Sequence, residues 1–392
     1  MLPTSRRGRL VLAGIAGSLL LLLGSAGVAA LRANAAWATF CEQTREIERD
    51  VAARPHHRDA LWGEHCGESA FAHYETAGRE ARALEQEIEL EKFCPKPDAE
   101  LVTAPVRPRW QTIAAALHRG AHATDTTPLP ASTLTDTTFG HFNMLWLRWI
   151  AYAAAHECRA LLHEGRQLDA VELSLDSATL ALDVARRGDA INQMIGGATL
   201  GIALGPWNDE RLARLPVAAL DEIAKGLERL DRAWPAIWDA DSELLTAARG
   251  VQSVIGDGGG GPWHYGFSAR WMFADAFPGY AKVLRGLAMV EPSWPRRAAL
   301  LEVAFAEEQA RGNVLADHYA DVQISIEHGA RRVCAGLRLL RMAVDLHRGG
   351  DMPPLTDPLG DGPIARTRTA GGTRLCCAND LLDHAVERLV RR

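Results

Sequence analysis

The chain has 392 residues, of which 47% are hydrophobic, and its formal net charge is −6. Residues 1–32 contain four arginines and no acidic residue, so the following 360 residues carry a charge of −6 − 4 = −10. This acidic balance, with Lys and Arg scattered rather than clustered, argues against nucleic acid as a partner. The length is ample for a large hydrophobic core.

The N-terminus carries the clearest pattern. Residues 10–31 form an uncharged run of 22, and the preceding basic segment, residues 1–9, contains Arg6, Arg7 and Arg9. At about 1.5 Å per residue, a helix of this length spans roughly 33 Å, which is enough to cross a hydrocarbon core of about 30 Å. Because basic flanks stay in the cytoplasm, we predict a transmembrane signal anchor at 10–31 with the remaining chain exported.

A cleaved signal peptide is the alternative for the same segment. Ala33-Asn34-Ala35 has the small-x-small pattern of a cleavage site, so cleavage near residue 35 is compatible with the sequence. The apolar run is longer than the roughly 7–15 residues usual for a signal peptide, and Arg32 lies directly before the site. Both interpretations place most of the chain outside the cytoplasm.

The exported part reads almost entirely as helix, because Ala, Leu, Arg and Glu dominate and Pro or Gly interrupts at intervals. We therefore predict an all-α fold in which the transmembrane helix precedes a multi-helix domain, as a bundle or helical hairpins. The predicted units are an N-terminal helical hairpin region at 36–120, a main α-helical domain at 139–348 and a C-terminal tail at 349–392. A polar, proline-containing stretch at 121–138 is the best linker candidate.

Potential metal ligands gather in the first of these units. The side chains are His56, His57, His65, Cys66 and His73. Imidazole and thiolate are good ligands for zinc or copper, but this spacing matches no known ligand template, and a histidine-rich turn can also be simply solvated. In the main domain, His156 and His163 are seven residues apart, about 10 Å along a helix, so we do not expect them to share an ion.

Two helices of the main domain are predicted with the most detail. The helix at 139–164 is apolar on nearly every face, which is typical of the centre of a helical core. The last long helix, 315–348, carries an apolar stripe that we expect to pack against the bundle. The stripe consists of Tyr319, Val322, Ile326, Ala330, Val333, Leu337, Leu340 and Val344. Gly349-Gly350 ends this helix.

Catalytic and redox motifs are missing from the sequence. The seven cysteines include no CxxC pair, which excludes thioredoxin-like, c-type haem and zinc-ribbon sites. Cys158 and Cys334 lie among apolar helical residues and are expected to be buried. There is no GxSxG elbow and no Ser-His-Asp order. We therefore assign no catalytic residue and no cofactor.

The tail has a recognisable turn. Asp357-Pro358 and Gly360, followed by Pro363-Ile364, resemble the C-terminal region of uncharacterised bacterial membrane-anchored helical proteins with a DPxxGxP-type turn. The resemblance implies a single-pass protein of the bacterial inner membrane and supplies no activity. From the residues we expect a turn whose flanks form a short β-hairpin on the last helix, or an irregular tail, followed by a helix-like segment at 379–392.

Together these observations predict a non-enzymatic, membrane-anchored envelope protein with a periplasmic or otherwise extracytoplasmic helical domain. Its expected partners are the membrane and another protein of the envelope or a small ligand. The alternative is a metal-binding protein or a hydrolase whose site the sequence does not reveal.

Overall fold

The computed structural model describes most of the chain. In the described part the protein has thirteen α-helices and a small three-stranded antiparallel sheet near the C-terminus, which confirms the predicted helical class. Within α1, side chains are described for residue 25 and from residue 27 onward. The described backbone covers residues 6–54, 68–94, 96–127, 129, 143–235, 238–255, 267–287, 293–379 and 385–391.

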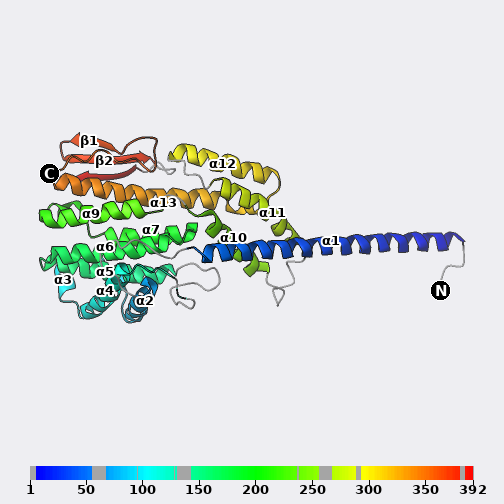
Figure 1. Ribbon diagram of the computed structural model, residues 1–392, viewed down its shortest axis with the longest axis horizontal. Helices are drawn as coiled ribbons and strands as arrows, with labels where there is room; N and C mark the ends of the chain where they lie inside the picture. Colours follow the sequence, from blue (N-terminus) through cyan, green and yellow to red (C-terminus); the bar gives the residue numbers. More distant parts are fainter. Residues whose placement is uncertain are drawn as a thin grey trace.

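Helix α1 (Arg6–Ala52) is one continuous helix of 47 residues. Its N-terminal part projects from the body, and its C-terminal part packs against α10 (Ala240–Ile255) and α11 (Phe267–Gly286) (Figure 1). The backbone of the predicted anchor lies in α1, whereas its side chains up to residue 24 are outside the described residues. In the part of the chain that is described, no helix has both the length and the hydropathy to cross a bilayer.

Ion pairs attach the end of α1 to the body. Arg54 donates to the carboxylates of Asp239 and Asp241 at 2.5 and 2.9 Å, and Arg249 donates to Glu48 at 2.7 Å.

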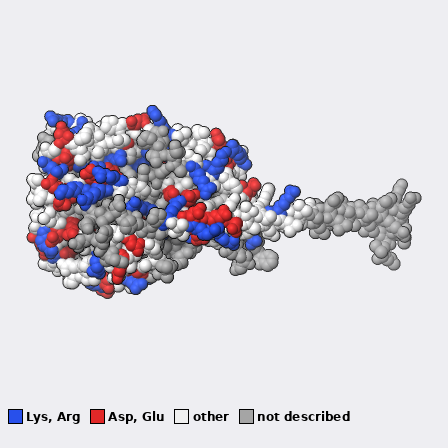
Figure 2. Space-filling view, viewed as in Figure 1, with Lys and Arg blue, Asp and Glu red and all other residues white. Residues whose placement is uncertain are grey.

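Acidic and basic side chains are interspersed over the face of the body shown in Figure 2. The charges on this face therefore pair locally rather than form a patch of one sign.

The predicted N-terminal hairpin region contains α2 (Ala70–Glu87), the 3₁₀ turn η1 (Leu90–Phe93), α3 (Asp98–Val102) and α4 (Arg107–His122). Pro108 stands in the first turn of α4, where a missing N–H costs nothing. Helices α2 and α4 lie side by side, and Gly120 permits the contact because a Cβ there would come within 2.3 Å of the Tyr74 ring. Of the predicted linker, residues 128 and 130–138 lie outside the described residues.

The centre of the body is formed by α5 (Met144–His163), α6 (Gln167–Ala185) and α7 (Ala190–Leu204). Helix α5, expected at the centre, is buried along most of its length but leaves Met144 and Leu145 exposed. Helix α6 is buried on nearly every face, including its polar residues Asp176 and Asp183. It contacts α4, α5, α7 and α9 (Val217–Ala233), and so it is the helix around which the others are arranged.

The second half of the body adds α8 (Asp209–Leu212), α12 (Trp294–Ala310) and the long α13 (Val314–His347). The bounds of α13 confirm the predicted helix within a residue. The Asn313 side chain accepts hydrogen bonds from the first turn, and Gly349, with a φ of +77°, ends the helix in the left-handed conformation. Helix α13 runs along the body and contacts α7, α9, α11 and α12 (Figure 1).

The predicted apolar stripe of α13 is confirmed only in its C-terminal half. Leu337, Leu340 and Val344 are buried, whereas Val322 is 45% exposed. In the N-terminal half the buried face is polar instead, because Glu327 on α13 pairs with Arg297 on α12 at 3.0 Å and both side chains are almost fully buried. The inward-facing side of α13 is thus held by an ion pair in its N-terminal half and by apolar side chains in its C-terminal half.

The tail contains the expected turn and more sheet than expected. The Asp357 side chain accepts a hydrogen bond from the Leu359 N–H, and Thr356 pairs with Pro363 across the turn. The strands β1 (Ala365–Thr369), β2 (Gly372–Asn379) and β3 (Ala385–Val390) follow in the order β1-β2-β3, and the sheet packs on α13.

The expectation of a helix-like segment at 379–392 is therefore wrong, because β3 occupies 385–390. Most of its residues are good helix formers, although Val386 and Val390 are β-branched. Val390 is 1% exposed and faces the same interior as Leu375 of β2, which is fully buried. Burial on a half-covered sheet outweighs the intrinsic helix preference of such a short segment.

This packing predicts different outcomes for two aspartate substitutions on α13. Leu337→Asp places a carboxylate at a site that is 1% exposed, and burying it without a partner costs several kcal/mol of a total stability of about 5–15 kcal/mol. Val322→Asp, on the same helix but at an exposed site, is expected to leave the thermal midpoint within a few degrees. Thermal unfolding followed by circular dichroism measures both, and equal midpoints would contradict the assigned orientation of α13.

Candidate metal centre

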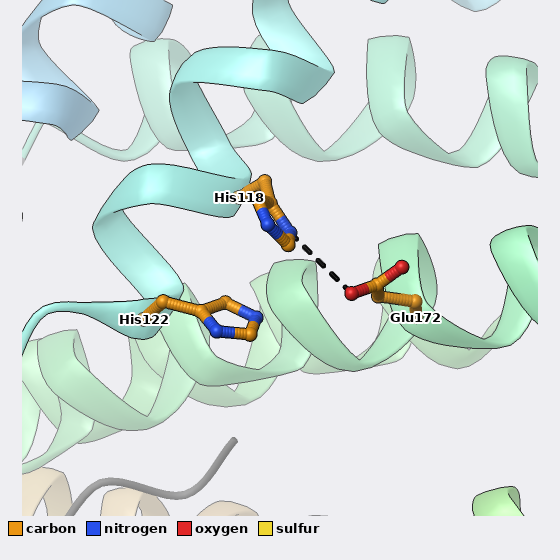
Figure 3. Close-up of side chains that lie close together, drawn as sticks. All are labelled: His118, His122 and Glu172. Atoms are coloured by element: carbon orange, nitrogen blue, oxygen red, sulfur yellow. Dashed lines mark ion pairs between the residues drawn. The ribbon is translucent and has the colours of Figure 1, made fainter. Parts of the chain in front are cut away.

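Two packed helices bring two pairs of potential ligands together. His118 and His122 lie in the last turns of α4, and Glu172 and Asp176 lie in the middle of α6. Each pair has i,i+4 spacing, which places its two side chains on one helix face, one turn apart. Because α4 packs against α6, the two faces meet. Figure 3 shows both imidazole rings and the Glu172 carboxylate converging on a common space.

The donor atoms are close to one another. The Nδ1 atom of His118 donates to Asp176 Oδ2 at 2.9 Å and lies 3.8 Å from Glu172 Oε1. The Nε2 atom of His122 lies 3.5 Å from Asp176 Oδ1, and the two imidazole centroids are 4.2 Å apart. One ligand atom each from His118, His122 and Glu172 lies within 4.8 Å of the other two.

Burial differs across the cluster. The Asp176 side chain is 2% exposed and forms the inner wall, whereas the Glu172 side chain is 57% exposed and forms the outer rim. The hydrogen bond from His118 to the buried Asp176 carboxylate raises the pKa of His118 above its ordinary value. The Nε2 atom of His122 is buried and makes no hydrogen bond. The cluster therefore contains a buried negative charge and a buried lone pair or N–H with no strong partner.

These distances suit a small divalent ion. Zinc binds imidazole nitrogen and carboxylate oxygen at about 2.0–2.2 Å in a tetrahedron, so ligand atoms stand roughly 3.3 Å apart. The 2.9, 3.5 and 3.8 Å separations lie on either side of this value. Two nitrogens and two oxygens form a ligand set that zinc accepts, and an ion among them would replace the His118–Asp176 hydrogen bond.

A groove beside the cluster leads to solvent. It has a volume of about 550 Å³, and His118, Glu172 and Asp176 lie along it. Its lining also includes Glu157, whose carboxylate receives two hydrogen bonds from Arg107 at 2.9 and 3.0 Å. Small solutes can therefore reach the outer side of the cluster, while the ion pair keeps that wall of the groove in place.

Arg107 bridges two acidic residues, Glu157 and Glu164, each of which directly follows one of the two histidines that cannot share an ion. It donates to both Glu157 and Glu164, at distances between 2.5 and 3.0 Å. These bonds hold the pKa of Glu164 below its ordinary value. The Arg107 side chain is 10% exposed, so the three groups form an ion-pair network that fixes α4 on α5.

Most of the sequence-predicted ligands cannot be compared with this cluster. His56, His57, His65 and Cys66 lie outside the described residues, so the metal site suggested there stays a prediction. His73 is described and is buried on α2, where its Nε2 atom lies 3.5 Å from Glu68. Burial lowers the pKa of His73, and this histidine is not a member of the His118 cluster.

Only the histidine pair of the observed cluster could be found from a local sequence pattern. His118 and His122 have the one-turn spacing whose absence excluded a shared ion between His156 and His163. The carboxylates follow 50 residues later, on a helix whose contact with α4 is not encoded in any local pattern. His156 is a core residue, because it is 1% exposed and its Nε2 donates to the Leu90 carbonyl at 2.9 Å.

Comparisons with known proteins assign no family. No protein-family model matches the chain, and neither the curated proteins nor the solved structures that were compared include a similar one. The resemblance of the tail to membrane-anchored helical proteins therefore stays a prediction.

His156 predicts a pH dependence of stability. Desolvation lowers its pKa from 6.5 to about 4 in the folded chain, since the ring is enclosed by aromatic side chains such as Trp110 and Tyr152. Between these values the unfolded chain binds the proton more strongly, so stability falls as the pH drops from about 6.5 towards 4. Lowering the pH from 7.5 to 4.5 is expected to cost about 2–3 kcal/mol at this residue.

Chemical denaturation at both pH values measures this loss. His156→Gln keeps an N–H for the Leu90 carbonyl but does not titrate, so its loss of stability should be smaller by that amount. An identical loss in the wild type and the variant would show that His156 does not contribute.

Proposed function

We propose that the protein is a membrane-tethered metal-binding protein whose helical body holds a divalent transition-metal ion. Zn²⁺ fits the ligand set best. His118 and His122 on α4 supply the nitrogen ligands, and Glu172 and Asp176 on α6 supply the oxygen ligands. The observation that carries the proposal is the convergence of His118, His122 and Glu172, whose ligand atoms lie within 4.8 Å of one another, beside the Asp176 carboxylate, which is 2% exposed.

A purely structural contact between α4 and α6 would account for less of the cluster. One histidine is enough to pair with Asp176, and the His118 hydrogen bond already does so at 2.9 Å. A contact of that kind does not require His122 to approach the same carboxylate to 3.5 Å, nor Glu172 to approach His118 to 3.8 Å. An ion at the centre would bind all four side chains directly.

The tether is supported by the sequence and by the position of α1. Residues 10–31 are uncharged and follow three arginines. In the projecting part of α1, Val28 and Leu31 are 51% and 72% exposed, and Ala33 is the first buried residue among the described side chains of this helix. Apolar side chains that extend beyond the body need another apolar environment, and a bilayer supplies it.

We place the protein in the bacterial inner membrane as a single-pass chain with its helical body on the extracytoplasmic side. An export-competent body that binds a metal ion is compatible with a buffering, delivery or structural role. The alternative of a protein-interaction module in the envelope stays a prediction, because no described surface identifies the partner.

Metal binding can be measured on the full chain, purified in detergent and stripped with a chelator. Calorimetric titration with Zn²⁺ is expected to show one site per chain. His118→Ala, His122→Ala and Asp176→Asn are each expected to weaken binding by about a hundredfold or more, since loss of even an outer-shell partner costs 10- to 100-fold. His163→Ala, at an exposed histidine of the adjacent helix α5, is the matched control and should bind normally.

Circular dichroism of each variant establishes that the helical body is intact. If all three variants retain wild-type affinity while a zinc ion still binds, the site lies elsewhere, and the His56–Cys66 segment becomes the first place to search. If the wild-type chain binds no ion with an affinity better than millimolar, metal binding is not its function.

The orientation of the tether has a separate test. Arg6, Arg7 and Arg9 are expected to remain in the cytoplasm, so alkaline phosphatase fused after Arg392 should be exported and active. Replacing the three arginines with glutamate should reduce that activity, since the orientation signal is then lost. An inactive wild-type fusion, together with an active cytoplasmic reporter at the same position, would reverse the topology.

A further inference from the structure

Two large apolar side chains are exposed side by side at the start of α11. Trp271 is 51% exposed and Met272 is 44% exposed. The opposite side of the same helix is well packed, with Phe277, Tyr280 and Leu284 buried in the body. The exposed pair is therefore not a poorly packed part of the core, and its position in the molecule suggests what covers it.

Helix α11 runs parallel to α1. The Arg270 guanidinium lies over the Trp37 ring, 5.8 Å from its centroid, and the Phe277 ring meets the Phe40 ring edge-on at 5.0 Å. Further along both helices, Arg285 borders the same cavity as Asp50. Residue numbers thus increase together, and the N-terminal end of α11 is the end nearer the projecting part of α1 (Figure 1).

The distance between the predicted span and Trp37 gives the position of the N-terminal end of α11 relative to the bilayer. Trp37 follows Leu31 by six residues, which is about 9 Å along the helix. The headgroup layer on each side of a bilayer is roughly 5–8 Å thick. The start of α11, which includes Arg270 and Trp271, therefore lies just outside the headgroup layer, about where the headgroups meet water. Tryptophan is enriched at that depth because the indole has an apolar body and one polar N–H.

We propose that the Trp271 and Met272 side chains contact the outer edge of the headgroup region of the bilayer, so that the start of α11 is a second, non-covalent contact between the body and the membrane. The inference rests on the proposed tether and does not depend on the metal site. Two cations border the headgroup layer, Arg32 on α1 at its inner edge and Arg270 on α11 at its outer edge, and both suit its phosphates. The contact would limit the swing of the body about α1 and hold it against the membrane surface.

Fluorescence quenching tests this contact in the full chain reconstituted into phosphatidylcholine–phosphatidylglycerol vesicles. Lipids that carry a nitroxide on the headgroup quench indoles at the membrane surface. We expect such vesicles to reduce the wild-type emission, and we expect most of this reduction to disappear in Trp271→Phe. Trp149→Phe, on a helix that does not pack against α1, is the matched control and should be quenched as the wild type is.

Flotation of the vesicles after an alkaline wash separates the two proposals. A chain that floats but shows equal quenching in the wild type and Trp271→Phe has its tether and lacks the α11 contact, which overturns the inference alone. A chain that is stripped by the wash has no spanning anchor, which overturns both. Because Trp271 is exposed, its replacement by Phe should leave the thermal midpoint unchanged, and this can be checked in the same samples.

Discussion

The arrangement of the body depends on the need to pair carboxylates buried on α6. This helix is enclosed on nearly every face, yet Asp176 and Asp183 are 2% and 3% exposed. An unpaired carboxylate in such surroundings would cost several kcal/mol, so the neighbouring helices must present partners to each of them. Tyr74 of α2 donates to Asp183 at 2.7 Å, and His118 of α4 donates to Asp176. The position of α4 on α6 follows from such a bond as much as from apolar packing, whereas α2, which packs on α4 and α5, reaches α6 through the Tyr74 hydroxyl.

The same constraint is met differently elsewhere in the body. Glu327 on α13 pairs with Arg297 on α12, and Glu157 on α5 pairs with Arg107 on α4. An arginine is always charged and cannot bind a metal, so these pairs only hold helices together. Imidazole can give up its proton and offer a lone pair. Within the described residues, His118, His122 and Glu172 form the single group of three potential metal ligands whose ligand atoms lie close together. The α4–α6 contact is therefore a candidate metal site because its partner to the buried carboxylate is a histidine, whereas the contacts made by arginine are structural.

The secondary-structure elements could largely be predicted from the sequence, whereas the tertiary contacts between them could not. The bounds of α13 were predictable because a capping Asn313 and a terminal Gly349 are local signals. The pairing of β3 with β2 was not, since its residues favour helix and the sheet is stabilised by contacts with α13. The candidate site was hidden for a related reason. The His118–His122 spacing was visible, but Asp176 lies 54 residues from His122 and joins it only when α4 packs on α6.

X-ray absorption spectroscopy of the zinc-loaded full chain tests the central claim most directly, because it identifies the atoms bound to the metal. The proposed site predicts nitrogen and oxygen ligands at about 2.0–2.2 Å, with the outer-shell scattering of two imidazole rings. This signal should be lost together with the metal in Asp176→Asn. A sulfur ligand at about 2.3 Å would contradict the account, because the cluster on α4 and α6 contains no cysteine, and would direct attention to the segment around Cys66.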